Sequence, residues 1–263
     1  MIKALYTAAT GMQAQQTAVD NAANNLANVD TNGYKRSSVQ FQDLIYQTVR
    51  SPGTQGATGL EVPTGIQIGS GVKVSAIGKI FTEGVLENTS NELDIAVEGP
   101  GFFQVLLPSG EFRYTRDGAF RLNSNGQLVT ADGYLLQPPI AIPNDTLSVT
   151  VGTDGTVSVV TAGAPNAATV VGNISTTRFS NPSGLRAEGR NLFAETTASG
   201  APITGTPGQN GLGTLQQGFL ERANVSVVTE LIQLITAQRA FEASQRAILT
   251  SDRLLETTNS IVR

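Results

Sequence analysis

The sequence predicts an α+β fold in which two long terminal helices form a coiled-coil pair around a central, mainly antiparallel β domain. Apolar residues recur every seven positions at both ends of the 263-residue chain, and Asx-Gly dipeptides occur at short intervals in the segment between them. Sustained seven-residue spacing is typical of paired helices, and Asx-Gly between short apolar stretches is typical of β-hairpins. We therefore expect a terminal helical domain (1–30 with 222–263), a Gly-rich connecting region (31–71) and a β-rich domain (72–221).

The first helix is expected over residues 2–28. Its main apolar row consists of Leu5, Met12, Val19 and Leu26. A companion row consists of Ile2, Ala9, Gln16 and Ala23. The only charged residues in this segment are Lys3 and Asp20. A helix with one solvated face normally carries more charge, so this helix is predicted to pack against neighbours on several sides.

The C-terminal helix shows the same spacing and lacks Pro and Gly from residue 219 onward, so we expect one long helix. Its seven-residue row consists of Val227, Leu234, Phe241, Ile248, Leu255 and Val262, and Leu231, Ile235 and Leu249 widen it. A second row on another face consists of Arg239, Arg246 and Arg253. Glu242 is spaced to pair with Arg239 and Arg246.

The middle of the chain is predicted to be an antiparallel β domain. Its turn dipeptides are Asp117-Gly118, Asn125-Gly126, Asp132-Gly133 and Asp154-Gly155. Before it, Ser37 and Gln40 have the spacing of a capping box, which favours a short helix over 39–49. The intervening stretch 51–72 contains six Gly and two Pro, which indicates a flexible linker or a long loop.

Composition excludes several classes of function. The chain has no Cys and no His, so thiol chemistry and the commonest general base and metal ligand are absent. Its net charge of −4 and the lack of a basic tract exclude the usual footprint of nucleic-acid binding. No apolar run is long enough to span a membrane. Residues 1–16 lack the apolar core of a signal peptide, so export would need another route.

The sequence also offers no convincing active site. The Gly-Pro-Gly at 99–101 lacks the third glycine of a dinucleotide-binding loop and runs into Phe102-Phe103. Acidic residues could in principle form a glycosidase pair, but Asp117 and Asp132 precede Gly in turns, where their side chains have structural roles. We therefore predict no enzyme activity, and no catalytic, cofactor-binding or metal-binding residue.

Several long motifs resemble one known family. "ANNLANVDTNGYKR" (23–36) resembles the signature that follows the first helix of bacterial flagellar rod and hook proteins, and residues 224–259 resemble their terminal helix. "GPGFFQV", "YTRDGAFRLNSNGQLVTADGYLLQ" and "LQQGFLERANVSVV" resemble central segments of the family. The resemblance covers nearly the whole chain. Its length and the stretch "LEVPTGIQIGSGV" favour a distal rod subunit, with proximal rod subunits and the hook protein as the nearest alternatives.

The resemblance implies a structural subunit that polymerises into a hollow, rigid shaft, transmits torque and lines the export channel. It implies export by the flagellar type III apparatus without a cleaved signal, and a location in the periplasm-spanning rod. The implied partners are further copies of the chain, proximal rod subunits, the hook protein and the surrounding P-ring and L-ring proteins. Nucleic acid and membrane insertion are not expected. An alternative from another class is a secreted β-domain adhesin or binding module with a coiled-coil stalk.

Asparagines crowd the end of the first helix at Asn24, Asn25 and Asn28, and Asn32-Gly33 follows as a turn. Two interpretations remain open. The amides could cap the helix and begin the turn. Alternatively, because an amide both donates and accepts without carrying charge, they could fix the register between helices. We include them with the apolar rows as candidate assembly residues.

Overall fold

A computed structural model describes residues 2–52, 64–164 and 167–261. The chain divides into two compact units. The first, called here the helix unit, contains residues 1–27, 37–78 and 226–263. The second, called the β unit, contains residues 28–36 and 79–225. The chain therefore passes between the units more than once, and each unit is assembled from segments far apart in the sequence.

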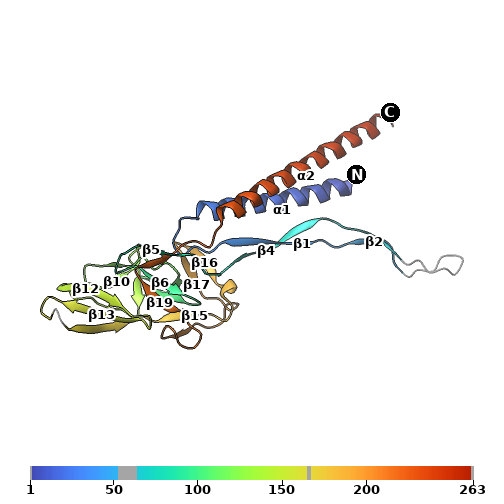
Figure 1. Ribbon diagram of the computed structural model, residues 1–263. Coiled ribbons are helices and arrows are strands. Elements are labelled where there is room, and N and C mark those ends of the chain that lie inside the picture. Colours follow the sequence, from blue (N-terminus) through green and yellow to red (C-terminus); the bar gives the residue numbers. More distant parts are fainter. Residues whose placement is uncertain (1, 53–63, 165–166, 262–263) are drawn as a thin grey trace. The chain divides into compact units, whose positions relative to one another are not determined.

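The helix unit contains two long helices that pack against each other, α1 (Ile2–Ala27) and α2 (Val227–Ile261), drawn in blue and red in Figure 1. Both helices and their contact confirm the predicted fold class. The unit also contains a narrow ribbon of strands, in which β1 (Ser37–Asp43) pairs with β4 (Val72–Lys79), and β2 (Gln47–Arg50) pairs with β3 (Ile66–Ile68).

The ribbon contacts α1 at several points. The hydroxyl of Thr10 accepts a hydrogen bond from the Val72 amide at 3.4 Å, and Lys3 Nζ donates to Gln47 Oε1 at 2.9 Å. Gly71 lies against the same Thr10, because a Cβ on Gly71 would be 2.2 Å from Thr10 Oγ1. The ribbon is thus held along the first helix by polar contacts and close packing.

The predicted short helix over 39–49 is wrong, because β1 and β2 occupy this segment. The sequence there alternates Val39, Gln40, Phe41 and Gln42, which is the period of a strand. β-branched residues follow as far as Val49, and they favour extended backbone. Within the Gly-rich stretch 51–72, β3 is an ordered strand, and residues 53–63 lie outside the described residues.

The β unit is built from antiparallel sheets, as predicted. Its largest sheet, within the described ranges, contains β7 (Phe102–Leu106), β8 (Phe112–Thr115), β9 (Arg121–Leu122), β10 (Leu128–Val129), β11 (Leu135–Gln137), β15 (Thr176–Arg178), β16 (Arg186–Gly189), β17 (Leu192–Ala194) and β18 (Ile203–Gly205). A three-stranded sheet contains β12 (Thr146–Val151), β13 (Thr156–Thr161) and β14 (Ala168–Asn173). Two further pairs are β5 (Leu86–Asn88) with β20 (Phe219–Glu221), and β6 (Ile95–Glu98) with β19 (Thr214–Gln217). A 3₁₀ turn, η1, spans Pro182–Gly184.

Three of the four Asx-Gly dipeptides lie between paired antiparallel strands, at Asn125-Gly126, Asp132-Gly133 and Asp154-Gly155. Each of their glycines has a positive φ, between 72° and 86°, which glycine adopts without steric cost. Asp117-Gly118 is different, because it follows β8 and joins no hairpin. Gly118 is required there for close approach, since a Cβ would lie 1.7 Å from the Ile95 carbonyl oxygen.

The core of the β unit consists of two clusters of buried side chains. One buried cluster contains Ile95, Val97, Phe103, Phe120, Leu128, Leu136, Ile140, Ile142, Val151, Val157, Val159, Ile174 and Leu215. A second, mainly aromatic cluster contains Phe102, Tyr114, Phe179, Leu185 and Phe193, with Phe81 packed against it. Its rings meet edge to face, with Tyr114 and Phe179 centred 4.7 Å apart, a geometry that adds to the energy of burial.

Candidate functional site: the helix pair and two buried polar junctions

The helix pair carries most of the residues predicted for assembly. Leu5, Met12, Val19 and Leu26 of α1 are half-buried, and so are Leu234, Phe241, Ile248 and Leu255 of α2. Small residues allow the helices to approach, since Ala14, Ala22 and Ala237 are buried and a Cβ on Gly11 would be 3.4 Å from Ser244 Oγ. The side chain of Ile2 and residue Val262 lie outside the described part of the chain.

The companion row of α1 does not take part in this seam. Ala9, Gln16 and Ala23 are exposed, and the positions buried beside the Leu5 row include Ala14 and Ala22 instead. Ala9, Gln16 and Ala23 alternate with the main row at intervals of four and three, which is the spacing of a seam, so spacing alone did not show that this row stays exposed. The exposed companion row leaves an uncharged surface on α1.

The first two turns of α2 present an uncovered apolar face. Its residues lie at helical spacing and are Val228, Leu231, Ile232 and Ile235, with 68%, 41%, 58% and 49% of each side chain exposed. Val227 lies beside this face and is also exposed. In a monomer, contiguous exposed apolar surface of this kind marks an interaction site. Of the predicted assembly residues of α2, Val227 and Leu231 therefore face away from α1.

The predicted charged row follows this apolar face along α2. Arg239, Glu242, Arg246 and Arg253 are all exposed. Arg246 Nη2 lies 3.5 Å from Glu242 Oε2, one helical turn away. Such surface pairs add little to stability, so this pair contributes little to holding the helix.

Asn25 forms the first buried polar junction. Its side chain is 1% exposed and joins three elements. Nδ2 donates to the Ser37 carbonyl oxygen at 2.9 Å and to Glu230 Oε2 at 3.1 Å, and Oδ1 accepts from the Ser37 amide at 2.9 Å. Asn21 Nδ2 donates to the same Ser37 carbonyl at 2.9 Å. Asn25 thus ties α1 to the start of β1 and to the first turn of α2, where Glu230 is also buried.

The other two asparagines of the cluster have different surroundings. Asn24 is exposed, whereas Asn28 is half-buried and begins a turn. Its carbonyl accepts from the Thr31 amide at 3.1 Å, and its Oδ1 accepts from the Thr31 hydroxyl at 3.2 Å. Asn28 therefore has the contacts expected of a turn residue, and Asn25 has those expected of a register residue.

The Asn32-Gly33 turn is docked inside the β unit. Gly33 has φ +67°, and its amide donates to the Glu221 carbonyl oxygen at 2.7 Å. A Cβ at this position would lie 2.6 Å from the Asp117 backbone nitrogen. The Asn32 carbonyl accepts from Asn191 Nδ2 at 3.0 Å. Only glycine satisfies both the left-handed backbone and the close approach.

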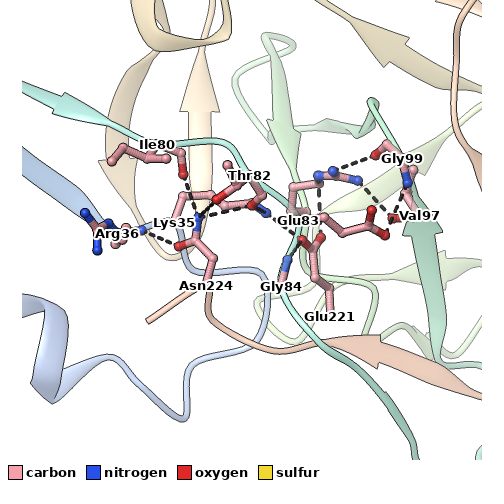
Figure 2. A network of polar contacts seen from close by, with 11 residues as sticks. Lys35, Arg36, Ile80, Thr82, Glu83, Gly84, Val97, Gly99, Glu221 and Asn224 are labelled. Carbon is pink, nitrogen blue, oxygen red and sulfur yellow. Dashed lines mark hydrogen bonds and ion pairs between the residues drawn. The ribbon is translucent and has the colours of Figure 1, made fainter. Parts of the chain in front are cut away.

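Lys35 and Glu221 form the second buried polar junction, which Figure 2 shows. Both side chains are fully buried, with Lys35 Nζ 2.5 Å from Glu221 Oε1. Lys35 Nζ also donates to the Thr82 carbonyl oxygen at 2.7 Å, and the Gly84 amide donates to Glu221 Oε1 at 2.9 Å. Burial lowers the pKa of Lys35, and Glu221 partly opposes this by favouring the charged amine.

Arg116 supplies a second cation to the same carboxylate. Its Nε lies 3.5 Å from Glu221 Oε2, too far and too poorly aligned for a hydrogen bond. Its other nitrogens donate to the carbonyl oxygens of Val97 at 3.1 Å and Gly99 at 2.7 Å. Burial lowers the pKa of Arg116, and Glu221 raises it. One buried carboxylate is thus shared by two buried cations.

Asn224 completes the junction by joining three stretches of chain. Its Oδ1 accepts from the Arg36 amide at 2.7 Å, and its Nδ2 donates to the carbonyl oxygens of Ile80 at 2.8 Å and Thr82 at 3.1 Å. The Ile80 amide in turn donates to the Arg36 carbonyl at 2.9 Å (Figure 2). Residues 35–36, 80–84 and 221–224 are therefore held together.

Sequence reasoning missed the partners in both junctions. Lys35 and Asn224 fall within the motifs "TNGYKR" and "LERAN", but nothing in their spacing indicates that they meet. For Glu230 a signal was available, because it is the one acidic residue in the first turn of α2. Two acidic side chains of the β unit have structural partners: Asp94 accepts from the Thr89 hydroxyl, and Asp117 accepts from the Ala119 amide.

Nothing in the described ranges suggests a metal or membrane site. No cluster of three or more acidic side chains with the geometry of a metal site occurs there. Neither described helix is both long and apolar enough to cross a membrane.

Three family models match the chain, and each describes flagellar axial proteins. Residues 5–35 match "Flagella basal body rod protein", residues 96–159 match "Flagellar hook protein FlgE/F/G D1 domain", and residues 216–261 match "Flagellar basal body rod FlgEFG protein C-terminal". The first and last of these contain Asn25, Lys35, Glu221, Asn224 and Glu230, so the main side chains of both buried junctions lie within segments that match the family models.

Full-length relatives decide the family. The flagellar basal-body rod protein FlgG of Buchnera aphidicola (subsp. Schizaphis graminum) is 46% identical over 99% of this chain and 100% of its own length. Those of Borreliella burgdorferi and Caulobacter vibrioides are also 46% identical, over 100% and 99% of both chains. The chain belongs to the FlgG family of flagellar basal-body rod proteins. Members of the family are structural components of the rod and not enzymes.

A solved flagellar hook protein, FlgE2 of Helicobacter pylori, aligns with 64% of this chain and 47% of its own length, at 15% identity and a TM-score of 0.24. A likeness this weak adds nothing to the family assignment, which depends on the FlgG relatives.

Proposed function

We propose that this FlgG-family subunit polymerises into the hollow, rigid helical shaft of the distal rod, which transmits motor torque to the hook and lines the export channel. The observation that carries the proposal is the uncovered apolar face at the start of α2. In the assembly, residues 1–30 and 222–263 form the inner tube and residues 72–221 form the outer layer. Residues 31–71 connect the two.

The apolar face provides the driving force for assembly. Val228, Leu231, Ile232 and Ile235 are 41–68% exposed in the single chain. Full burial of one such side chain contributes about 1.5–3 kcal/mol, so four partly exposed ones provide a substantial gain. A contact between different faces of like subunits generates a helical filament when the rotation from one subunit to the next does not close into a ring.

The remaining predicted residues surround this apolar contact. The uncharged surface of α1 at Ala9, Gln16 and Ala23 accepts a neighbouring helix without burying unpaired charge. Arg239, Glu242, Arg246 and Arg253 form a polar rim. Asn25 fixes the register of α1 and α2 within each subunit. Because their apolar faces lack partners, the terminal helices are only marginally stable before assembly and become fully ordered in the filament.

The family assignment supports the partners and location of this subunit. It contacts proximal rod subunits at one end of its segment and the hook protein at the other. The P-ring and L-ring proteins surround it in the periplasm-spanning part of the basal body. The subunit reaches this position through the flagellar type III export apparatus, without a cleaved signal peptide.

Electron microscopy of the concentrated full-length protein tests the proposal. Wild type is expected to form open-ended tubes, and Ile232→Asp is expected to abolish them because it places a charge in the apolar contact. Leu147→Asp is the matched control, since Leu147 is 64% exposed on β12, and it should assemble normally. Closed dimers or trimers of wild type would instead support the adhesin alternative, and normal tubes from Ile232→Asp would contradict the role of the α2 face.

A further inference from the structure

Three Asn-Gly dipeptides lie in the β unit, at Asn32, Asn125 and Asn210. Asn-Gly is the sequence most open to deamidation on chemical grounds, because glycine offers no side chain to hinder its own backbone nitrogen. That nitrogen must lose its proton and approach the asparagine side-chain carbon. The three sites therefore differ only in what the fold does to the glycine nitrogen and to the surrounding charge.

Two of the sites are protected. The Gly33 amide donates to the Glu221 carbonyl oxygen at 2.7 Å, and Gly33 is buried. The Gly126 amide donates to the Asn123 carbonyl oxygen at 3.0 Å within the β9–β10 turn. In both cases the hydrogen bond must break before the nitrogen can attack, and this raises the barrier.

The third site lacks this protection. Asn210 and Gly211 are both exposed, in the loop between β18 and β19. Within the described residues, no hydrogen bond from the Gly211 amide is found, although those of Gln209 and Leu212 are bonded. Asn210 has φ +52°, a left-handed conformation that costs an L-residue about 1–2 kcal/mol.

A cation lies beside the Gly211 backbone. A Cβ on Gly211 would be 3.7 Å from Arg178 Nη1, so the guanidinium is next to the Gly211 backbone. Arg178 Nε is buried without a hydrogen-bond partner, and in the described ranges the side chain has no ion pair. A positive charge at this distance stabilises the negative charge that develops on the attacking nitrogen and on the tetrahedral oxygen.

We propose that Asn210-Gly211 is a site of spontaneous deamidation assisted by Arg178. The Gly211 nitrogen gives up its proton and bonds to the Asn210 side-chain carbon. The bond from that carbon to the amide nitrogen then breaks, and ammonia leaves. Water opens the resulting succinimide at either carbonyl to give aspartate or isoaspartate. The net reaction consumes one water, releases one ammonia and needs no oxidant or reductant.

The product has a consequence for the local charge. Deamidation creates a negative charge one residue from Gly211, the residue against which the Arg178 guanidinium lies. The modification is therefore accommodated by the fold, and it changes the exposed β18–β19 loop from neutral to negatively charged. This inference is independent of the assembly proposed above.

Incubation of the full-length protein at mildly alkaline pH, followed by peptide mass spectrometry, tests the proposal. In the folded protein, Asn210 should deamidate about fivefold faster than Asn125, the factor expected from one hydrogen bond fewer to break. In concentrated urea the three sites should converge. Equal or faster reaction at Asn125 or Asn32 in the folded protein would overturn the proposal.

Arg178→Gln tests the assisting charge. It should slow the reaction at Asn210 and leave Asn125 unchanged, whereas Arg178→Lys should keep most of the rate. Arg121→Gln, an exposed arginine on β9, is the control and should change neither. If Arg178→Gln does not fold, the deamidation rates of wild type and Arg178→Lys are measured at low and at high salt instead, because screening should slow only Asn210. An unchanged Asn210 rate in Arg178→Gln, or at high salt, would contradict the role of Arg178.

Discussion

The β unit contains a large cluster of fully buried apolar residues, whereas the helix unit leaves a contiguous apolar face exposed at the start of α2. In the β unit, Phe103, Ile95 and Val157 are completely buried, and the apolar residues of its clusters pack on one another. In the helix unit, Val228 and Ile232 remain 68% and 58% exposed. One chain can therefore bury the core of its β unit by itself, while the apolar face of its helix unit is left for the proposed assembly to cover.

The buried polar junctions of the two units also differ in their chemistry. The junction of the β unit is ionic, with Glu221 between Lys35 and Arg116. That of the helix unit depends on an amide, with Asn25 between Ser37 and Glu230. A buried ion pair is costly to break once formed, and an amide is more tolerant of rearrangement. Four changes test how far this contrast extends.

The largest effect is expected for Glu221→Gln. It leaves the buried charges of Lys35 and Arg116 without their counter-ion, which should destabilise the β unit by about 3–5 kcal/mol. Urea unfolding monitored by near-ultraviolet signals of the buried tyrosine measures it. Glu87→Gln is the control, because Glu87 pairs with Arg222 at the surface, and it should change little. Equal effects of the two variants would show that burial of the pair is unimportant.

Gly33→Ala is expected to rank second. The left-handed backbone costs about 1–2 kcal/mol, and the clash with the Asp117 backbone adds about 1–3 kcal/mol. Thermal unfolding of the β unit measures the sum. Gly133→Ala separates the two contributions, because Gly133 also has a positive φ, +85°, but its Cβ would meet nothing within 4 Å. The clash is excluded if both variants lose the same stability.

Asn25→Ala should destabilise the helix unit by about 1–3 kcal/mol, since it removes the buried hydrogen bonds that Asn25 makes to Glu230 and to the Ser37 backbone. Hydrogen exchange of α1 and α2 amides reports the loss, which should not extend to the β unit. Asn24→Ala is the matched control, since Asn24 is exposed at the adjacent position. If both variants behave alike, the buried amide does not set the register.

The smallest effect concerns alkaline pH. Burial raises the pKa of Tyr114 from 10.0 to about 12, and nearby Glu195 adds to the shift. Because the folded state keeps the phenol proton longer, Tyr114 contributes stability below pH 10 and loses it as the pH rises towards about 12. Tyr114→Phe should flatten this decline in a series of urea unfolding curves. A decline of the same slope in Tyr114→Phe would assign it to other groups.

Elements with a local sequence pattern could be predicted from the sequence. The seven-residue rows predicted both helices, and Asx-Gly predicted three hairpins correctly, because each signal depends on residues close together in the chain. The helix expected over 39–49 failed for a related reason: the capping-box spacing of Ser37 and Gln40 was given more weight than the alternation of Val39 and Phe41.

The junctions could not be predicted in the same way. Asn25 was selected as a candidate for register, which stays a prediction; the structure shows that its side chain is buried and bonded to Ser37 and Glu230. Its partner Glu230 lies 205 positions later, and Lys35 and Glu221 are 186 apart. No local pattern links residues at such distances, and only the folded arrangement brings them together. Likewise, heptad spacing could not tell which side of α2 faces α1.

The hydrogen bonds of Asn224 have a consequence for domain exchange between related proteins. Because Arg36, Ile80 and Asn224 are hydrogen-bonded to one another, three places where the chain enters or leaves the β unit lie close together. A foreign domain grafted between residues 80 and 224 must therefore reproduce these three anchors, and it must also contact Gly33 and Lys35, as Asp117 and Glu221 do here. Chimeras that meet both requirements should fold, and evolution could diversify the rest of the domain by the same route.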